Sequence, residues 1–156
     1  MGAINQAFNQ AAGAVAGAAL AIKHAKELEF SKMNSADNSA LIARNQSRAA
    51  DAEANAANDE AMKEGGLVQQ LSEAEVNREE VEKAYNKAKK RNDGLTRVKK
   101  FTELEAAKKA ENELRNKYQA IVDINNRAEE QRIYASKATE IALKAKEKYE
   151  KRWGDK

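Results

Sequence analysis

The residues that could do chemistry in this 156-residue chain are few, and their spacing gives little support for catalysis. His24 is the only histidine and there is no cysteine, so a Cys/His metal site and a Ser-His-Asp triad are nearly excluded. Gly65-Gly66 lacks the Lys-Ser or glycine spacing of a phosphate-binding loop. Carboxylate pairs such as Glu79-Glu80 interleave with Lys and Arg at helical spacing, which is typical of solvated helix faces. We therefore expect no enzyme, no metal site and no cofactor.

Phosphate contacts are the one chemistry for which the charges offer candidates. Basic residues gather between positions 87 and 100 and could contact a nucleic acid, although a solvated helix face is the simpler interpretation. Further along, amide and guanidinium groups recur beside the apolar positions. They would line a wet lumen in a ring of parallel helices, or face solvent in a simple dimer. The candidate phosphate or lumen residues are Lys89, Lys90, Arg97, Lys99, Asn125, Gln131 and Arg132.

The elements that must position these residues are helices. The chain has no proline, and it is rich in Ala, Glu, Lys, Gln and Arg, which are strong helix formers. Charged residues make up 34% and aromatic residues 5%, so little large apolar material is left for a globular core. We predict an all-α fold of long helices with heptad seams, arranged as an extended coiled coil or as an α-helical barrel or tube.

The first 22 residues differ from the rest of the chain because they carry no charge. A helix of this length reaches ~33 Å, about the thickness of a hydrocarbon core. Five strongly inserting side chains oppose four amides, so the insertion of a single helix would be marginal. Three interpretations stay open: a self-associating membrane-active helix, the Ala-rich end of a packed helix, or a cleaved signal. The candidate membrane or assembly residues are Ile4, Phe8, Gly13, Val15, Gly17, Leu20 and Ile22.

Small apolar residues recur in alternating steps of four and three, the spacing of a helix that packs against another helix. Between positions 36 and 61 nearly all of these residues are alanines. Because alanine buries little area, we expect stability to require many aligned contacts, and therefore an obligate oligomer. The predicted oligomer seam comprises Ala43, Ala50, Ala57, Leu71, Val81, Leu114, Ile121, Ala128, Ala135 and Ala142.

Three places are expected to bend or interrupt the helices. Capping residues cluster at 34–38 and predict a kink or a loop. The glycine pair at 65–66 would ordinarily end a helix, but the seven-residue repeat keeps its register across it, so we interpret the pair as a hinge within a long rod. Positions 92–94 predict a turn or a phase slip. The expected regions are an N-terminal helix at 1–22, an alanine-seam helix at 23–64 and a long coiled coil at 67–153.

The uncharged Ala/Gly-rich N-terminus with its Gly13-Gly17 pair, followed by heptads from Leu67 to Tyr149, resembles the DNA pilot (minor spike) protein of microviruses, the small single-stranded DNA phages. The resemblance is architectural and covers most of the chain. It implies a non-enzymatic virion component that assembles into a parallel α-helical tube, through which the genome crosses the host envelope.

The expected partners are further copies of the chain, a membrane contacted through the N-terminus, single-stranded DNA and other capsid proteins. The expected location is the virion, with membrane contact during infection, and otherwise the cytoplasm. The alternative is a cellular coiled-coil interaction or adaptor module folded as an antiparallel helical hairpin or bundle. Such a module packs Leu71–Leu95 against Leu104–Ile124 of the same chain, whereas a tube aligns each residue with itself.

Overall fold

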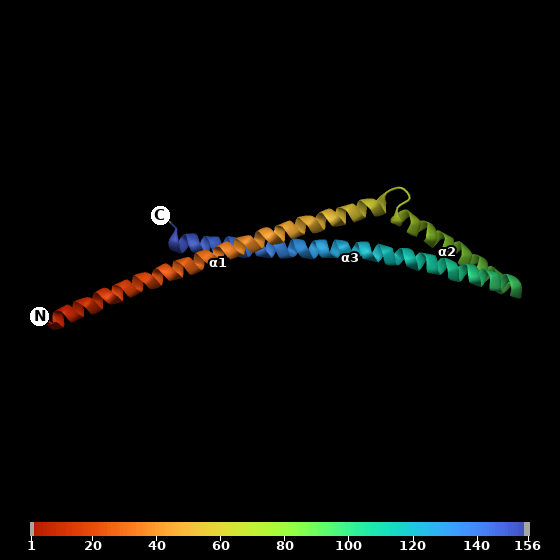
Figure 1. The fold of residues 1–156 in the computed structure, drawn as a ribbon. Helices are drawn as coiled ribbons and strands as arrows, with labels where there is room; N and C mark the ends of the chain where they lie inside the picture. Colours follow the sequence, from red (N-terminus) through yellow and green to blue (C-terminus); the bar gives the residue numbers. More distant parts are fainter. Residues whose placement is uncertain (1, 155–156) are drawn as a thin grey trace. The chain divides into compact units, whose positions relative to one another are not determined.

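The structure is a computed structural model that describes residues 2–154. Within these residues it consists of three helices, α1 (Gly2–Met62), α2 (Leu67–Lys90) and α3 (Gly94–Trp153), with no strand (Figure 1). Long uninterrupted helices are the outcome expected from a chain without proline and with abundant strong helix formers. The predicted all-α class is confirmed.

The helices form two compact units. The first unit combines the N-terminal part of α1, up to Gln46, with the part of α3 that begins at Arg132. The second unit, Ser47–Gln131, contains the end of α1, the whole of α2 and the beginning of α3. Each unit buries its own set of small side chains.

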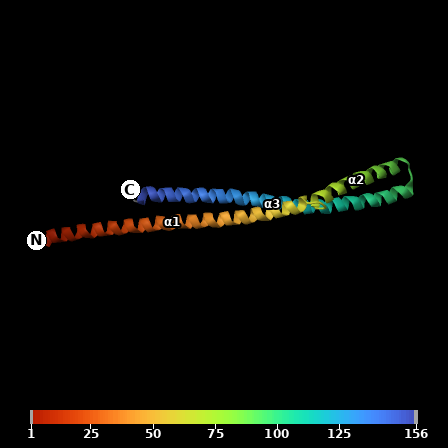
Figure 2. The same cartoon turned by 90° about the horizontal axis from the view of Figure 1, so that it is seen from above.

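In the second unit, α1 and α2 pack on α3, which runs in the opposite direction (Figures 1 and 2). Asn58 of α1 contacts Asn125, and Arg78 of α2 contacts Glu111. As the residue number increases along α1 and α2, the number of the contacted residue in α3 therefore decreases. This is the antiparallel packing within one chain that the helical-hairpin alternative predicts. It differs from the parallel alignment of a tube.

In the first unit, α1 and α3 are likewise antiparallel. The rings of Phe30 and Tyr149 lie 5.5 Å apart between their centroids, and the Trp153 indole donates a hydrogen bond of 2.6 Å to Glu29. Between these contacts and the other end of the unit the interior consists of small residues, of which Ala40 is 1% exposed. Alanine at these positions lets the two helix backbones approach closely.

The ten residues predicted for the oligomer seam all face the interior of their units. Their burial shows that each chain covers this seam with its own helices; a contact between copies through the same residues stays a prediction. Ala43, Ala128, Ala135 and Ala142 are buried, and Ala50, Ala57, Leu71, Val81, Leu114 and Ile121 are half-buried.

The loop considered at 34–38 is wrong, because α1 continues through these residues. Met33 and Ala36 are half-buried and Ala40 is buried, so the packing of this stretch continues on both sides of its capping residues. Packing along one face outweighs the weak preference of Asn, Ser and Asp for helix ends.

The helix is not continuous at 65–66, because α1 ends at Met62 and α2 begins at Leu67. A hinge at this break stays a prediction. Gly65 has φ +72°, a left-handed conformation that favours glycine. The seven-residue repeat keeps its register across this break for a different reason. Ala61 before the break and Leu71 after it both face inward in the same unit, so the two helices share one packing pattern.

The turn predicted at 92–94 is confirmed. Asn92 has φ 56°, and α3 begins at Gly94. The Asp93 side chain accepts hydrogen bonds from the backbone N–H of Thr96 (3.3 Å) and from its hydroxyl (2.7 Å), which satisfies donors of the first turn of α3. These bonds also lower the pKa of Asp93, the hydroxyl contributing most.

Candidate functional site

The most distinctive surface is the start of α1, which we call the uncovered segment (residues 2–24). Every residue in it is exposed, and this part of α1 extends beyond the end of α3 (Figures 1 and 2). Ile4 and Phe8 are 74% exposed and Val15 is 71% exposed, values that are unusual for large apolar side chains. A Cβ atom added at Gly13 or Gly17 would meet nothing within 4 Å. The segment therefore exposes apolar residues and two glycines on the surface of the chain.

The cover over α1 ends where α3 ends. Glu29 is half-buried and accepts the Trp153 hydrogen bond, while Arg152 forms an ion pair with the same carboxylate. Ala25, one turn earlier, is the last half-buried position toward the N-terminus. The seam residues before it follow the same spacing but have no helix of the described chain over them. Among residues 2–154, no helix is both long enough and apolar enough to cross a membrane.

The uncovered segment has two distinct faces. Successive helix residues are about 100° apart, so the seam residues Phe8, Val15 and Ile22 fall on one stripe. Gly13 and Gly17 each lie two residues from Val15, and therefore about 160° away from it around the helix. The segment thus offers a seam face and, opposite it, a glycine face.

The four predicted phosphate contacts lie at the turn between α2 and α3. Lys89 and Lys90 end α2, while Arg97 and Lys99 lie in the first turns of α3, and all four are exposed. The neighbouring aromatic ring has a structural contact, because Phe101 packs on Tyr85 with 5.9 Å between ring centroids. The structure therefore brings the basic residues to one end of a helical hairpin, and their contact with phosphates stays a prediction.

The three predicted lumen residues have different environments. Asn125 exchanges two hydrogen bonds with Asn58, of 3.0 and 2.9 Å, so its amide lies between α1 and α3. Gln131 is half-buried, and its Oε1 atom is buried without a hydrogen-bond partner. Arg132 is exposed. A lumen lined by these side chains stays a prediction.

Sequence reasoning missed a charged cluster around Glu111, which is only 4% exposed. Its carboxylate accepts hydrogen bonds from Arg115 Nη2 (2.7 Å) and Arg78 Nε (2.5 Å). Arg78 also pairs with Glu82 at 2.9 Å, and Arg115 pairs with Glu75 at 2.9 Å. Arg78 could have indicated this cluster from the sequence, because a charged residue at a seam position predicts an opposite charge on the facing helix.

The cluster shifts the titration of its members. Hydrogen bonds from Arg115, and then those from Arg78, lower the pKa of Glu111, although its burial opposes this. The pKa of Arg78 is raised, chiefly by its hydrogen bond to Glu111. A carboxylate held ionised in this way is a poor general acid at neutral pH. The arrangement fixes α2 against α3 and supplies no proton for catalysis.

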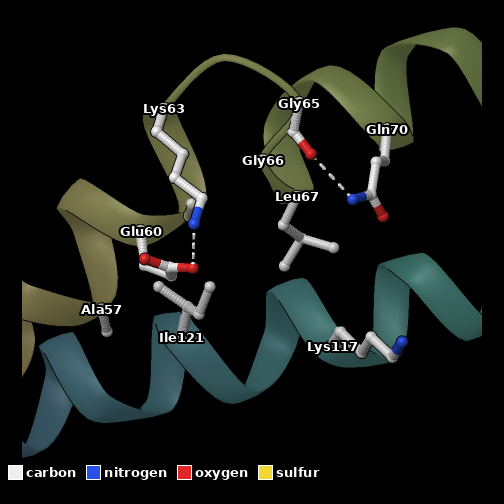
Figure 3. A pocket seen from close by; sticks show the side chains of 10 residues that line it. Ala57, Glu60, Lys63, Gly65, Gly66, Leu67, Gln70, Lys117 and Ile121 are labelled. Atoms are coloured by element: carbon white, nitrogen blue, oxygen red, sulfur yellow. Dashed lines mark hydrogen bonds and ion pairs between the residues drawn. The ribbon is translucent and has the colours of Figure 1, made fainter.

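A hollow of about 510 Å³ lies at the break between α1 and α2 (Figure 3). Leu67 points from α2 toward α3, and Ile121 points from α3 into the gap. The polar groups around it are engaged locally, since Lys63 pairs with Glu60 and Gln70 donates to the Gly65 carbonyl at 2.9 Å. In the described part of the chain, no cluster of three or more His, Cys, Asp or Glu side chains could hold a metal.

Comparison of the chain with protein families, with curated proteins and with solved structures finds no match. The class of molecule that the structure itself defines is an all-α protein of long helices. Its most distinctive surface is the uncovered segment.

Proposed function

We propose that the chain is a non-enzymatic structural protein of a virion that oligomerises, contacts membrane through its N-terminus and conducts DNA during genome delivery. The observation that carries the proposal is the uncovered segment, in which residues 2–22 carry no charge and Phe8 and Val15 are exposed. An exposed row of large apolar residues is typical of a surface that binds another protein or a membrane. The resemblance to microvirus pilot proteins supplies the virion setting.

The polar residues inside the units support a structural role. Arg78 pairs with Glu111 and Arg115 pairs with Glu75, both between α2 and α3, and Asn58 of α1 bonds with Asn125 of α3. Contacts of this kind specify which residues face one another, because a mismatched register would leave a buried polar group unpaired. They hold the helices of the second unit in one alignment.

The proposed membrane contact requires association of several segments. A single segment is not apolar enough to cross a membrane, because five apolar side chains contribute only roughly −1.5 to −3 kcal/mol in total against four amides. Packing through Gly13 and Gly17 would let helix backbones approach closely and let the amides satisfy one another across helices. The open space at both glycines in the single chain is compatible with this.

Vesicle leakage tests this role. We expect the wild-type protein to release dye from liposomes, and Gly13→Leu to reduce the release although it adds apolar surface. Ala19→Leu, which adds a similar side chain away from the glycine face, is the matched control and should not reduce leakage. If leakage rises equally in both variants, the segment partitions without assembling. If the wild type releases nothing, the membrane role is wrong.

A second candidate is a cellular coiled-coil interaction or adaptor module, which the antiparallel packing within one chain favours. The two candidates differ in oligomeric state. The virion protein should be an oligomer whose helicity falls on dilution, because dissociation removes the packing partners. Analytical ultracentrifugation that finds a helical monomer at all concentrations would favour the module.

A further inference from the structure

We propose that a groove between α1 and α3 in the first structural unit binds an amphipathic helix with acidic flanks, supplied by another protein. We call this groove, formed by residues 29–39 of α1 and 134–149 of α3, the lysine groove. The inference goes beyond the membrane and DNA roles proposed above, because it concerns a protein partner and a different surface. The argument uses only the first structural unit.

The lysine groove consists of two neighbouring hollows along the same pair of helices. The larger hollow has a volume of about 490 Å³ and is lined by Ala36 of α1 and Ala138 of α3. The smaller one, of about 180 Å³, is lined by Ala145 further along α3. Lys32 lines both hollows, so they lie on the same side of the pair. The lining of α3 at 134–149 spans ~22 Å, or about four helical turns.

Apolar side chains of different sizes make the groove suitable for another helix. Ala36, Ala138 and Ala145 are half-buried and form its floor. Tyr134 and Ile141 line the α3 side and are 59% and 62% exposed, although both are large. Side chains spaced three and four residues apart on a third helix would pack against these two residues and on the alanines, as in helix-in-groove recognition.

The two helices of this unit bury little apolar area by themselves. Among the described residues of the unit, all those that are buried are alanines, namely Ala40, Ala43, Ala135 and Ala142. Alanine contributes less to the hydrophobic effect than larger side chains, because the effect scales with the apolar area removed from water. A third helix over Tyr134 and Ile141 would therefore add apolar burial that the pair lacks.

The open side of the groove favours a helix over an acyl chain. Pockets for small ligands enclose most of the surface of the ligand. Tyr134 and Ile141 stay largely exposed, so an acyl chain lying beside them would keep one side in water. An amphipathic helix avoids this cost, because the face that it turns to water is polar.

The rim of the groove is basic. Lys32 and Lys137 line the larger hollow, Lys148 lines the smaller one, and all three are exposed. In the part of the chain that the structure describes, none of these lysines forms an ion pair. Glu29, the only carboxylate among the described lining residues, already pairs with Arg152. The groove thus combines an apolar floor with unneutralised positive charge, which complements an apolar stripe with acidic flanks.

Charge also favours another protein over a second copy of the chain. The unpaired apolar helix that a second copy offers is its uncovered segment, whose residues 2–22 carry no acidic side chain. Lys137 and Lys148 lie ~16.5 Å apart along α3, which is about three turns. A partner with two carboxylates three turns apart on one flank would face both lysines, and a carboxylate on the other flank would face Lys32.

Binding of synthetic helices to the full chain tests the proposal. The acidic probe is a fluorescent peptide of about 18 residues, or five turns, with leucines in steps of three and four and glutamates on both flanks. The basic probe has lysines in place of the glutamates. We expect one acidic probe to bind per chain, at least tenfold more tightly than the basic probe. Its affinity should fall with salt, because the flanking charges are exposed. Fluorescence anisotropy measures both.

Two matched pairs of variants assign the binding to the groove. Lys137→Glu should weaken binding of the acidic probe at least tenfold and strengthen binding of the basic probe. Lys146→Glu should change neither affinity by more than twofold, because Lys146 lies about 180° from Lys137 around α3. Ile141→Gln should weaken binding of the acidic probe even at high salt, whereas Leu143→Gln, at a similarly exposed position outside the groove, should not. All four side chains are exposed, so each variant should keep its helicity by circular dichroism.

Equal affinity for the two probes, or an equal loss in Lys137→Glu and Lys146→Glu, would overturn the proposal, because binding would then not depend on the groove. The absence of binding to the folded wild type would overturn it as well. Vesicles that contain anionic phospholipid are the competing ligand. If vesicles bind through Lys137 and Ile141 and the acidic probe does not, the groove is a lipid site and the proposal is wrong. Dye leakage plays no part in this test, so failure of the membrane role and failure of the groove are distinguishable.

Discussion

Polar side chains at seam positions give these helices their register. An alanine seam carries little shape information, because every alanine layer resembles the next. Two polar pairs fix the alignment of the helices: Asn58 with Asn125, and Arg78 with Glu111. A shift of one helix along another would leave these side chains without their hydrogen-bond partners. Specificity in this protein therefore resides in a few polar residues, as it does for single polar positions in coiled coils.

The amide pair should be measurable by a double-mutant cycle. Asn125→Leu leaves the Asn58 amide without its partner, which should cost about 1–2 kcal/mol in the free energy of unfolding. The double variant Asn58→Leu with Asn125→Leu should recover most of this loss, because no unpaired amide remains. Urea denaturation followed by circular dichroism gives both values. Additive losses would show that the two amides do not interact in solution.

Acid should weaken the Glu111 cluster. Its folded pKa is lowered, mainly by Arg115, so its contribution to stability is complete above the unfolded value of about 4.3. The contribution is lost as the pH falls through the lowered folded pKa, because protonation removes the acceptor of both arginine contacts. Thermal unfolding from pH 6 to pH 2 should show this loss.

Glu111→Gln supplies the matching comparison at the same position. We expect it to lose about 2 kcal/mol at pH 7 and to show a flatter acid response than the wild type. Glu113→Gln, an exposed change on the same helix, should leave both quantities nearly unchanged. An identical acid response in the wild type and Glu111→Gln would mean that other carboxylates control acid unfolding.

The helices themselves, and the residues that face inward, were predictable from composition and the seven-residue repeat. The sequence did not predict which helix covers each seam. The repeat crosses 65–66 in register because the helices on both sides pack in the same unit, and a sequence pattern cannot distinguish that from one continuous helix. Likewise, Asn34 and Ser35 are good caps by type, yet packing of the neighbouring Met33 and Ala36 keeps them within α1.

The glycine pair should respond to substitution as a turn. Gly65→Ala would place a side chain at φ +72°, which should cost about 1 kcal/mol. Gly66→Ala should cost more, because its Cβ would lie 2.7 Å from the carbonyl oxygens of Glu60 and Ala61. Gly13→Ala is the control, since it occupies open space in a helix and should stabilise the protein by about 0.5–1 kcal/mol. A gain in stability from alanine at position 65 or 66 would support a continuous helix and contradict the turn.

The basic end of the α2–α3 hairpin makes a separate prediction. If Lys89 and Lys90 contact phosphates, replacing both by glutamine should lower the slope of log affinity against log salt for single-stranded DNA by ~1.4, at ~0.7 per contact. Lys108→Gln with Lys109→Gln removes the same charge elsewhere on α3 and should change the slope less. Fluorescence anisotropy measures both. A wild-type protein without affinity for DNA would contradict the role in DNA transport.

For the whole molecule, the sequence allowed two arrangements, and local residues did not choose between them. An alanine seam packs on another alanine seam in either direction, so the heptads fit a parallel tube as well as a hairpin. The candidate site was more predictable than the fold around it. Residues 1–22 stood apart by their lack of charge, and the described residues 2–22 are exposed in the structure.

The central claim is that each chain covers its own α1 with its own α3 and leaves the first residues of α1 open. The most direct test is a distance between spin labels at Lys32 and Lys148, two lysines beside one small hollow of the first unit. Doubly labelled chains diluted into excess unlabelled protein should give a short distance, on the order of 10–20 Å, because packed helices lie about 8–10 Å apart. If the short distance disappears on dilution, α1 is covered by another chain and the account is contradicted.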